Sequence, residues 1–435
     1  MVHTREQLMD VRGQGRGAWA SRWRMTLLVV VLGVVAFVWR RDRGDDPIRV
    51  GILHSTTGPM AISERSMVEA ELLAIEEINA RGGLLGRRLE PVIADGASDW
   101  PTFAREAERL ITQEKVDIIF GCWTSASRKT VLPVIERNAH LLVYPMVYEG
   151  LEQSPNVIYT GAAPNQHVIP ALKWSIDNLG PRIFLLGSDY IWPHTINAIM
   201  SDVLPALGAT LVGEEYVFFG SSKVEKAVAA IARAQPDVII SSVVGESNIA
   251  LYRALREAGI TPEKVPVVSF SVSEEELRTL NRVQLAGQYL AWNYFQSVQS
   301  SENAQFIERF RRRYGADRVT SDPIETAYFS VYLWATAVAE AGAADLDVVR
   351  TAMLGQSFGA PEGIVSIDPA TRHTWRSFSM GKVREDGQVD LVWTTGKPIR
   401  PVPYPSSRSH SEWNAFLADL QAGWGGAWAN PVEAP

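Results

Sequence analysis

The sequence predicts an α/β protein made of two similar lobes, each with a parallel, doubly wound sheet. Short apolar strands alternate with amphipathic helices from Ile48 onward. The alternation starts again at Arg182 and runs over a second stretch of similar character. Turn and cap residues stand at the boundaries: Gly82-Gly83 ends one expected helix, and Asp99 precedes Pro101 at the start of the next. Repeated βα units of this length favour parallel sheets with helices on both faces.

The expected elements of the first half follow each other without a long gap. Its strands are expected at 48–55, 89–96, 116–121 and 140–144, and its helices at 64–81, 100–113 and 125–138. The helix at 64–81 shows the pattern most clearly, because Met67, Ala70, Leu73 and Ala74 recur at helical spacing.

The second half repeats this order and then changes character. Its strands are expected at 182–187, 210–218, 238–243 and 265–270, and its helices at 192–207, 224–234, 248–258, 301–314 and 323–341. Short strands dominate the part from 363 to 403. We expect the first lobe to comprise 48–163 and 294–345, and the second lobe 164–293 and 346–435.

The N-terminus has the features of an export signal. A basic leader, residues 1–24, precedes an uncharged apolar run at 25–39, and a charged linker at 40–47 follows. The run is either the core of a cleaved signal peptide or an uncleaved signal anchor. Because it offers no good small-residue cleavage site, the anchor is favoured, which predicts a protein outside the cytoplasmic membrane and tethered to it by this helix.

Composition excludes several classes of function. The net charge of −7 argues against nucleic acid as a partner, because a phosphate-binding surface needs clustered Lys and Arg. The single cysteine, Cys122, forms no internal disulfide or zinc site, and we expect it to be buried and inert. The sequence has no nucleophile elbow, P-loop, dinucleotide-binding or zinc motif. We therefore expect no enzyme activity, no cofactor and no metal.

Candidate binding residues lie in the loops that follow the strands. In open parallel sheets, ligands bind beyond the carboxyl ends of the strands, and two facing lobes bring these ends to one cleft. The loops carry hydroxyls, aromatic rings and few charges, which suits a small, neutral, hydrogen-bonding ligand. The candidates are Thr124, Ser125, Tyr144, Met146, Tyr190, Gly245, Glu246 and Ser271.

Two of these candidates have alternative interpretations. Ser125 opens an expected helix, so its hydroxyl is either a helix cap or a ligand contact. Glu246 follows an apolar strand and Gly245; it is either a carboxylate that accepts amide N–H groups or a solvated loop residue. Tyr144 and Tyr190 stand at or just after strand ends, where aromatic rings are expected to wall the ligand.

Several long strings resemble the urea-binding components of ABC importers, a family related to the amide-sensing regulator of aliphatic amidase. They include GILHSTTGPMAISE, ELLAIEEINARGGLLGR, FGCWTSASRKTVLPVIE, GSDYIWP and YGADRVTSDPIE. The resemblance extends from about Ile48 to Tyr404. It implies a type I periplasmic-binding-protein fold, with two lobes joined by three crossovers that close on a ligand.

The resemblance also implies roles for individual residues. GCWTSASRK places a ligand-contacting hydroxyl at Ser125, the YP and GSDY motifs place aromatic walls at Tyr144 and Tyr190, and VVGES places an acidic residue at Glu246. The chain departs from the importers at Met146-Val147, which is more apolar, and a slightly larger or more methylated amide would fit that change.

Three hypotheses of function follow from these features. The leading one is a binding protein that delivers urea or a short amide to the permease of an ABC importer. The second is a sensor that reports such a ligand to another protein through the same fold. The third, an enzyme acting on amides, is disfavoured because the sequence has no nucleophile–base constellation.

Overall fold

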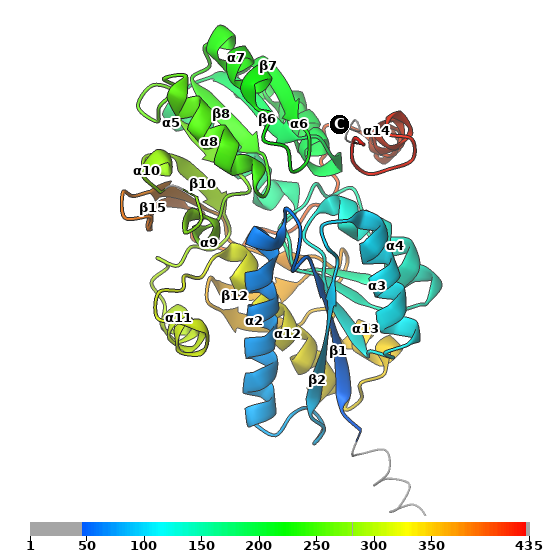
Figure 1. Ribbon diagram of the computed structural model, residues 1–435. Helices are drawn as coiled ribbons and strands as arrows, with labels where there is room; N and C mark the ends of the chain where they lie inside the picture. The colour runs from blue at the N-terminus through cyan, green and yellow to red at the C-terminus, as the bar shows by residue number, and fades with distance from the viewer. Residues whose placement is uncertain (1–45, 281, 432–435) are drawn as a thin grey trace, which may run out of the picture.

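A computed structural model describes residues 46–280 and 282–431, and these form two α/β lobes (Figure 1). The expected leader at 1–24, the apolar run at 25–39 and most of the linker lie outside the described residues. Within the described part of the chain, no helix has the length and apolar character needed to cross a membrane.

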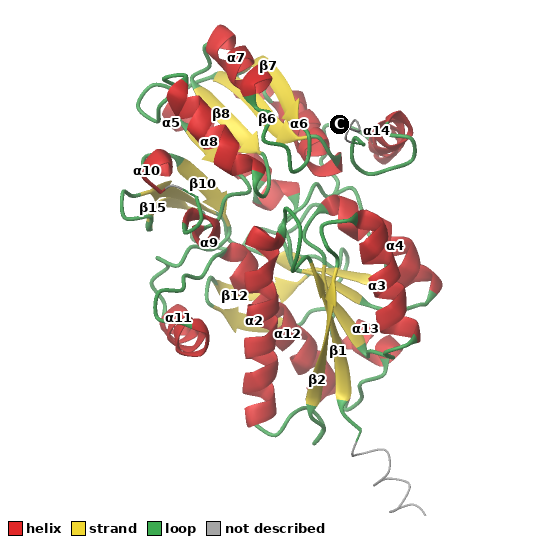
Figure 2. Cartoon of the chain, in the orientation of Figure 1, coloured by secondary structure: helices red, strands yellow, loops and turns green. Residues whose placement is uncertain are grey.

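The first lobe is built on a fully parallel sheet with the strand order β2-β1-β3-β4-β5. The strands are β1 (Ile48–His54), β2 (Leu89–Asp95), β3 (Ile118–Gly121), β4 (Leu142–Tyr144) and β5 (Val157–Tyr159). The helices are α2 (Ala61–Ala80), α3 (Trp100–Thr112), α4 (Ser125–Arg137), α12 (Asp322–Ala341) and α13 (Leu346–Ala352). Helices cover both faces of the sheet (Figure 2), and β1 and β3 are accordingly apolar and almost wholly buried.

The second lobe is built on a mixed sheet with the order β15-β14-β10-β9-β8-β6-β7. Its parallel strands are β6 (Arg182–Ser188), β7 (Thr210–Val217), β8 (Val238–Ser242), β9 (Val267–Ser269) and β10 (Tyr289–Trp292). The antiparallel strands β14 (Ser379–Val383) and β15 (Val389–Thr394) complete one edge. Its helices are α5 (Val168–Leu179), α6 (Ile191–Val203), α7 (Glu225–Ala234), α8 (Ser247–Glu257), α9 (Glu274–Leu277) and α10 (Arg282–Leu285).

The remaining elements lie around the two lobes. They are α11 (Ser301–Tyr314), β11 (Ser357–Ala360), β12 (Gly363–Ile367), β13 (Thr374–Trp375), α14 (His410–Gly423) and the short 3-10 turns at Pro164–Gln166 and Pro205–Leu207. Strands β11, β12 and β13 form a small antiparallel sheet.

The structure confirms the α/β fold class and the two parallel-sheet lobes of the type I arrangement. Local signals act as expected: the Asp99 carboxylate accepts the Thr102 N–H at 3.0 Å and starts α3, with Pro101 in its first turn. Cys122 is fully buried, and burial raises the pKa of its thiol.

One lobe boundary differs from the expected one. Residues 346–375 were expected in the second lobe, but they lie against the first. Helix α13 packs on α12, and His373 bridges to Tyr159 of β5 and stacks on its ring at 4.3 Å. The physical reason is that this segment buries its apolar side chains on the first lobe before the chain crosses to β14.

A buried arginine ties the three crossovers between the lobes together. The Arg376 guanidinium donates to the Asp322 carboxylate at 2.9 Å and to the Thr160 carbonyl at 3.4 Å. Asp322 in turn accepts the N–H groups of Asn293 and Tyr294 at 3.0 and 2.9 Å. Thr160, Asn293 and Arg376 belong to the first, second and third crossover, so one polar node joins all the hinge segments.

Candidate functional site

The two lobes touch closely along the cleft. Gly245 of the second lobe adopts φ +63°, and a Cβ placed on it would lie 2.8 Å from the Pro59 carbonyl oxygen and 3.0 Å from the Met60 sulfur. On the same side, the rings of Trp100 and Phe219, one from each lobe, meet at 5.0 Å. The described conformation is therefore closed.

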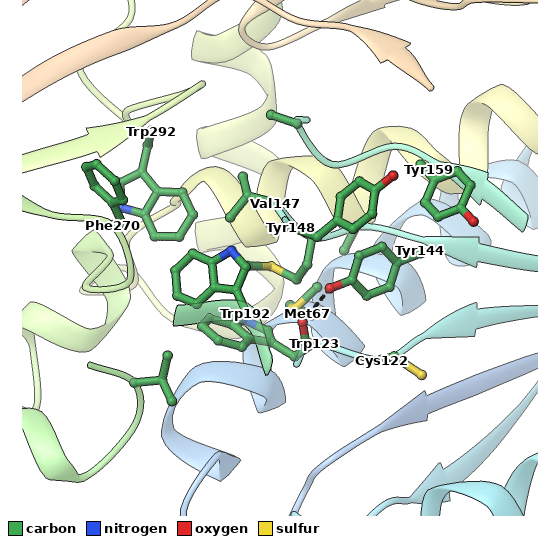
Figure 3. Close-up of a cluster of buried hydrophobic side chains, with 14 of the residues drawn as sticks. Met67, Cys122, Trp123, Tyr144, Val147, Tyr148, Tyr159, Trp192, Phe270 and Trp292 are labelled. Atoms are coloured by element: carbon green, nitrogen blue, oxygen red, sulfur yellow. Dashed lines mark hydrogen bonds between the residues drawn. The ribbon is translucent and has the colours of Figure 1, made fainter. Parts of the chain in front are cut away.

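A small, partly open cavity lies between the lobes. It has about 180 Å³ of empty space, but its walls leave no room for a water molecule, so a solute bound there requires the lobes to lie slightly further apart than in this conformation. Its walls are Trp123, Ser125, Met146 and Val147 from the first lobe and Tyr190 and Trp192 from the second. Figure 3 shows that Trp123, Val147 and Trp192 belong to a larger cluster of buried apolar side chains. A solute reaches such a cavity only when the lobes part.

The lining residues all follow the carboxyl ends of strands, as the fold rule requires. Cys122, directly after β3, adopts φ +67° and donates its N–H to the Leu53 carbonyl at 2.9 Å, and this turn leads into Trp123. Met146 and Val147 come two and three residues after β4. Tyr190 and Trp192 come after β6, at the start of α6.

Two buried hydrogen-bond donors at this cavity have no partner. Across the described ranges of the chain, the indole N–H groups of Trp123 and Trp192 meet no acceptor. Leaving a buried donor unpaired costs about 1–3 kcal/mol. The two residues come from different lobes and line the same cavity.

A buried network of charged side chains lies behind Ser125, on the first-lobe side of the cavity. The Ser125 hydroxyl donates to Glu149 and accepts from Arg128 at 3.2 Å. Arg128 pairs with Glu149 at 2.8 Å and with Glu152 at 2.9 Å, and Lys129 pairs with Glu152 at 3.1 Å. Two basic side chains thus face two acidic ones, and each of the four is paired within the network.

The pKa values of this network follow from the pairing. Burial alone would raise the pKa of Glu152, but the charges of Arg128 and Lys129 outweigh burial and lower it to about 2. Burial lowers the pKa of Arg128, but the charges of Glu152 and Glu149 raise it by more, so the pKa lies above its ordinary value. The guanidinium also lies over the rings of Tyr144 and Tyr148, at 4.7 and 4.5 Å from their centroids. Glu152 is therefore a carboxylate and Arg128 a guanidinium cation at neutral pH.

Three of the eight sequence candidates line the cavity: Ser125, Met146 and Tyr190. Tyr144 lies behind the wall, where its hydroxyl donates to the Trp123 carbonyl at 2.8 Å (Figure 3), so it supports the wall without lining it. Thr124 caps α4 by accepting the Ser127 N–H at 3.0 Å. Of the two roles considered for Ser125, the helix cap is therefore filled by Thr124 instead.

The other three candidates, all from the second lobe, lie elsewhere. Ser271 is buried and donates to the Val243 carbonyl. Gly245 forms the lobe contact with Pro59. Glu246 is exposed and lines an open polar groove at the edge of the lobe interface, together with Arg65, Glu69, Glu275 and Arg278. The structure thus places the Glu246 carboxylate outside the cavity, because the loop turns it outward.

Sequence reasoning missed three lining residues: Trp123, Val147 and Trp192. Each is within two residues of a candidate that does line the cavity. The available signal was the unusual tryptophan content, 14 in 435 residues, combined with positions just after strand ends. In the described parts of the chain, no group of three or more His, Cys, Asp or Glu side chains is placed to hold a metal ion.

The fold and the interlobe cavity define a two-lobed solute-binding protein. A family model described as "Periplasmic binding protein domain" matches residues 48–410, and the chain belongs to this family. The family implies an extracytoplasmic location.

Known proteins that cover most of the chain agree with this class. The leucine-, isoleucine-, valine-, threonine- and alanine-binding protein of Pseudomonas aeruginosa is 21% identical over 381 residues, which cover 79% of this chain and 92% of that protein. A solved solute-binding protein of an ABC transporter from R. palustris, in complex with 4-hydroxybenzoate, superimposes with a TM-score of 0.73. The two are 21% identical over 81% of this chain and 98% of the other.

A shorter match has a different name. Limonene hydroxylase of Geobacillus stearothermophilus is 30% identical over 118 residues, which are 27% of this chain and 22% of that protein. The chain thus spans about a fifth of the hydroxylase. The relatives that cover most of the chain are named as binding proteins.

Proposed function

We propose that the chain is the solute-binding component of an ABC importer and that it captures urea or a short-chain amide in the cavity between its lobes. The observation that carries this proposal is the pair of unpartnered indole N–H groups, Trp123 and Trp192, at a small cavity under which the charged side chains are paired with one another. A carbonyl oxygen accepts two hydrogen bonds and would satisfy one donor from each lobe.

The remaining wall suits the rest of an amide. The hydroxyl oxygens of Ser125 and Tyr190 are acceptors that amide N–H groups could reach. Met146 and Val147 offer an apolar surface for a methyl or ethyl group. Acetamide or propionamide would use all three features, whereas urea lacks the apolar group.

An amide is neutral, whereas the ligands named for the relatives, amino acids and a hydroxybenzoate, carry a carboxylate. A buried carboxylate needs a cation of its own. In this chain both cations under the cavity, Arg128 and Lys129, are already paired with Glu149 and Glu152. This pairing supports a neutral ligand over an anionic one.

The test is a calorimetric titration with urea, acetamide, propionamide, leucine and 4-hydroxybenzoate. We expect heat of binding from the amides or urea and none from the two carboxylates. Trp123→Phe and Trp192→Phe should each weaken binding of the amide by about three- to tenfold, because each removes one neutral hydrogen bond.

Trp393→Phe is the matched control. Trp393 lies on β15 with 39% of its surface exposed, away from the cavity, and its variant should bind as the parent protein does. Binding of the carboxylates alone, or unchanged amide affinity in both cavity variants, would contradict the proposal.

We also propose that residues 25–39 tether the protein to the outer face of the cytoplasmic membrane. The support is the uncharged apolar run flanked by arginines, without a good cleavage site. A tether would keep the binding protein close to its permease and raise its effective concentration there.

A further inference from the structure

The C-terminal segment returns to Tyr190, one of the residues that line the cavity, after the chain has completed both lobes. The family model ends at residue 410, and the described chain continues to residue 431. In Figure 1, α14 lies beside α6 of the second lobe.

This segment is anchored on the second lobe before it reaches Tyr190. Arg408 forms two hydrogen bonds with the Asp202 carboxylate, at 2.8 and 2.7 Å. Trp413 of α14 is fully buried, and its indole N–H donates to the Pro405 carbonyl at 3.0 Å. The Trp424 ring meets His194 of α6 edge-on at 5.1 Å. The anchored helix delivers residues 428–430 to a fixed place.

Residues 428–430 pair with the backbone on both sides of Tyr190. The Ile191 N–H donates to the Trp428 carbonyl at 3.0 Å, and the Asn430 N–H donates to the Asp189 carbonyl at 3.0 Å. Between these bonds, Ala429 and Tyr190 form an antiparallel bridge. The Asn430 side chain adds a bond to the Asp189 carboxylate at 2.7 Å.

The same segment also contacts the first lobe. The Lys129 ammonium lies over the Trp428 ring at 5.0 Å from its centroid. Lys129 belongs to α4, next to Arg128, which bonds to the cavity residue Ser125. A cation over an indole ring contributes roughly 0.5–2 kcal/mol, and here the two partners come from opposite sides of the cleft.

We propose that residues 424–430 act as a strap that positions Tyr190 against the cavity and is held in place by the first lobe when the lobes close. Asn430 and Trp428 are the positioning residues. Neither lines the cavity; both act through the Asp189–Ile191 backbone. Lys129 of the first lobe thus contacts Trp428, and Trp428 holds the backbone beside Tyr190 of the second lobe. Through these contacts, closure of the lobes fixes the position of Tyr190 at the cavity.

Hydrogen–deuterium exchange of the full chain, without added solute, tests the strap independently of the ligand's identity. The readout is the Ile191 amide, whose acceptor is the Trp428 carbonyl. In Asn430→Ala we expect this amide to exchange about tenfold faster, since a side-chain bond that holds the strap is lost. The matched control is Gln421→Ala, which removes a bond inside the tail, to the Gly426 carbonyl at 3.1 Å, and should leave Ile191 unchanged.

A second pair of variants tests the contact across the cleft. Lys129→Met should speed exchange at Ile191, on the opposite lobe, whereas Lys129→Arg keeps the cation and should preserve protection. A tail that only stabilises the second lobe would show no difference between these two variants. Unchanged Ile191 exchange in both Asn430→Ala and Lys129→Met would overturn the strap. If exchange responds as expected but neither urea nor an amide binds, the strap stands and the proposed ligand class is wrong.

Discussion

Trp123 and Trp192 each carry one side-chain atom, the indole nitrogen, on which the proposed ligand depends. Each residue buries an indole N–H that finds no acceptor in the described chain, and the two belong to opposite lobes. The closed conformation therefore bears two desolvation costs that a carbonyl oxygen would offset. In the proposed function, these two groups couple ligand capture to closure.

We expect Glu276 to make lobe closure depend on pH. It lies on α9 of the second lobe, and Ser63 of the first lobe donates a hydrogen bond to its buried carboxyl. The Ser273 N–H donates to its other oxygen at 2.9 Å. Burial raises the pKa of Glu276 to about 7, although both hydrogen bonds lower it, and the neighbouring Glu275 adds to the increase.

The sign of the effect follows from the raised pKa. When the lobes part, Glu276 loses Ser63 and gains water, so its pKa falls toward the ordinary value of 4.5. Closure therefore takes up a proton. Protonation of Glu276 favours the closed form fully at pH values below 4.5, and this contribution is lost as the pH rises through about 7.

We expect affinity for acetamide to fall about tenfold or more between pH 5 and pH 8. Glu276→Gln, which is neutral at every pH, should flatten this profile. Calorimetry at several pH values checks both expectations, and a parent profile that is flat or rises with pH would contradict the role given to Glu276.

The rule that ligands bind beyond the carboxyl ends of parallel strands predicted some of the cavity residues and not others. The rule led to Ser125, Met146 and Tyr190, which line the cavity. It also led to Glu246, whose exposed side chain lines the open groove at the edge of the lobe interface and not the cavity. Which of these two places a side chain at a strand end reaches depends on how the lobes meet, and no local pattern contains that information.

At the scale of elements, most helices and strands could be predicted because their signals are local. Helix α3 has a cap and an apolar stripe, and α4 and α8 begin within a residue of their expected starts. Helices α5 and α14 were not predicted, although α14 has a complete capping box at Ser409 and Glu412. The placement of 346–375 on the first lobe depends on long-range packing, which periodicity does not reveal.

The loop between β8 and α8 sets how closely the lobes approach. At Gly245 a Cβ would meet the Pro59 carbonyl at 2.8 Å, and the positive φ adds strain for any other residue. We therefore expect Gly245→Val to hinder closure and weaken amide binding at least tenfold.

The thermal unfolding midpoint of Gly245→Val, measured without solute, reports the strain at the positive φ, which is present in open and closed lobes alike. Gly259→Val is the control, because residue 259 of the same lobe also has a positive φ, +73°, but a Cβ there would meet nothing within 4 Å. Its unfolding midpoint should fall as in Gly245→Val, whereas its affinity should stay parental. Gly245→Val with parental affinity would show that the lobes need not come this close.

At the scale of the whole molecule, the hinge between the lobes and the cavity are built from different residues. The crossovers meet at Arg376, which is fully buried and surrounded by Asp322, Glu325 and Glu362. Burial raises the pKa of Glu362 to about 7, and the Arg376 charge only partly opposes it. A polar node of this kind fixes the geometry of the three segments about which the lobes rotate.

Small-angle X-ray scattering of the full chain with and without acetamide tests capture by closure most directly. The radius of gyration should fall when acetamide is added to the parent protein, should fall less in Trp123→Phe at the same concentration, and should not respond to 4-hydroxybenzoate. A radius that stays constant at acetamide concentrations where calorimetry shows full binding would contradict capture between the lobes.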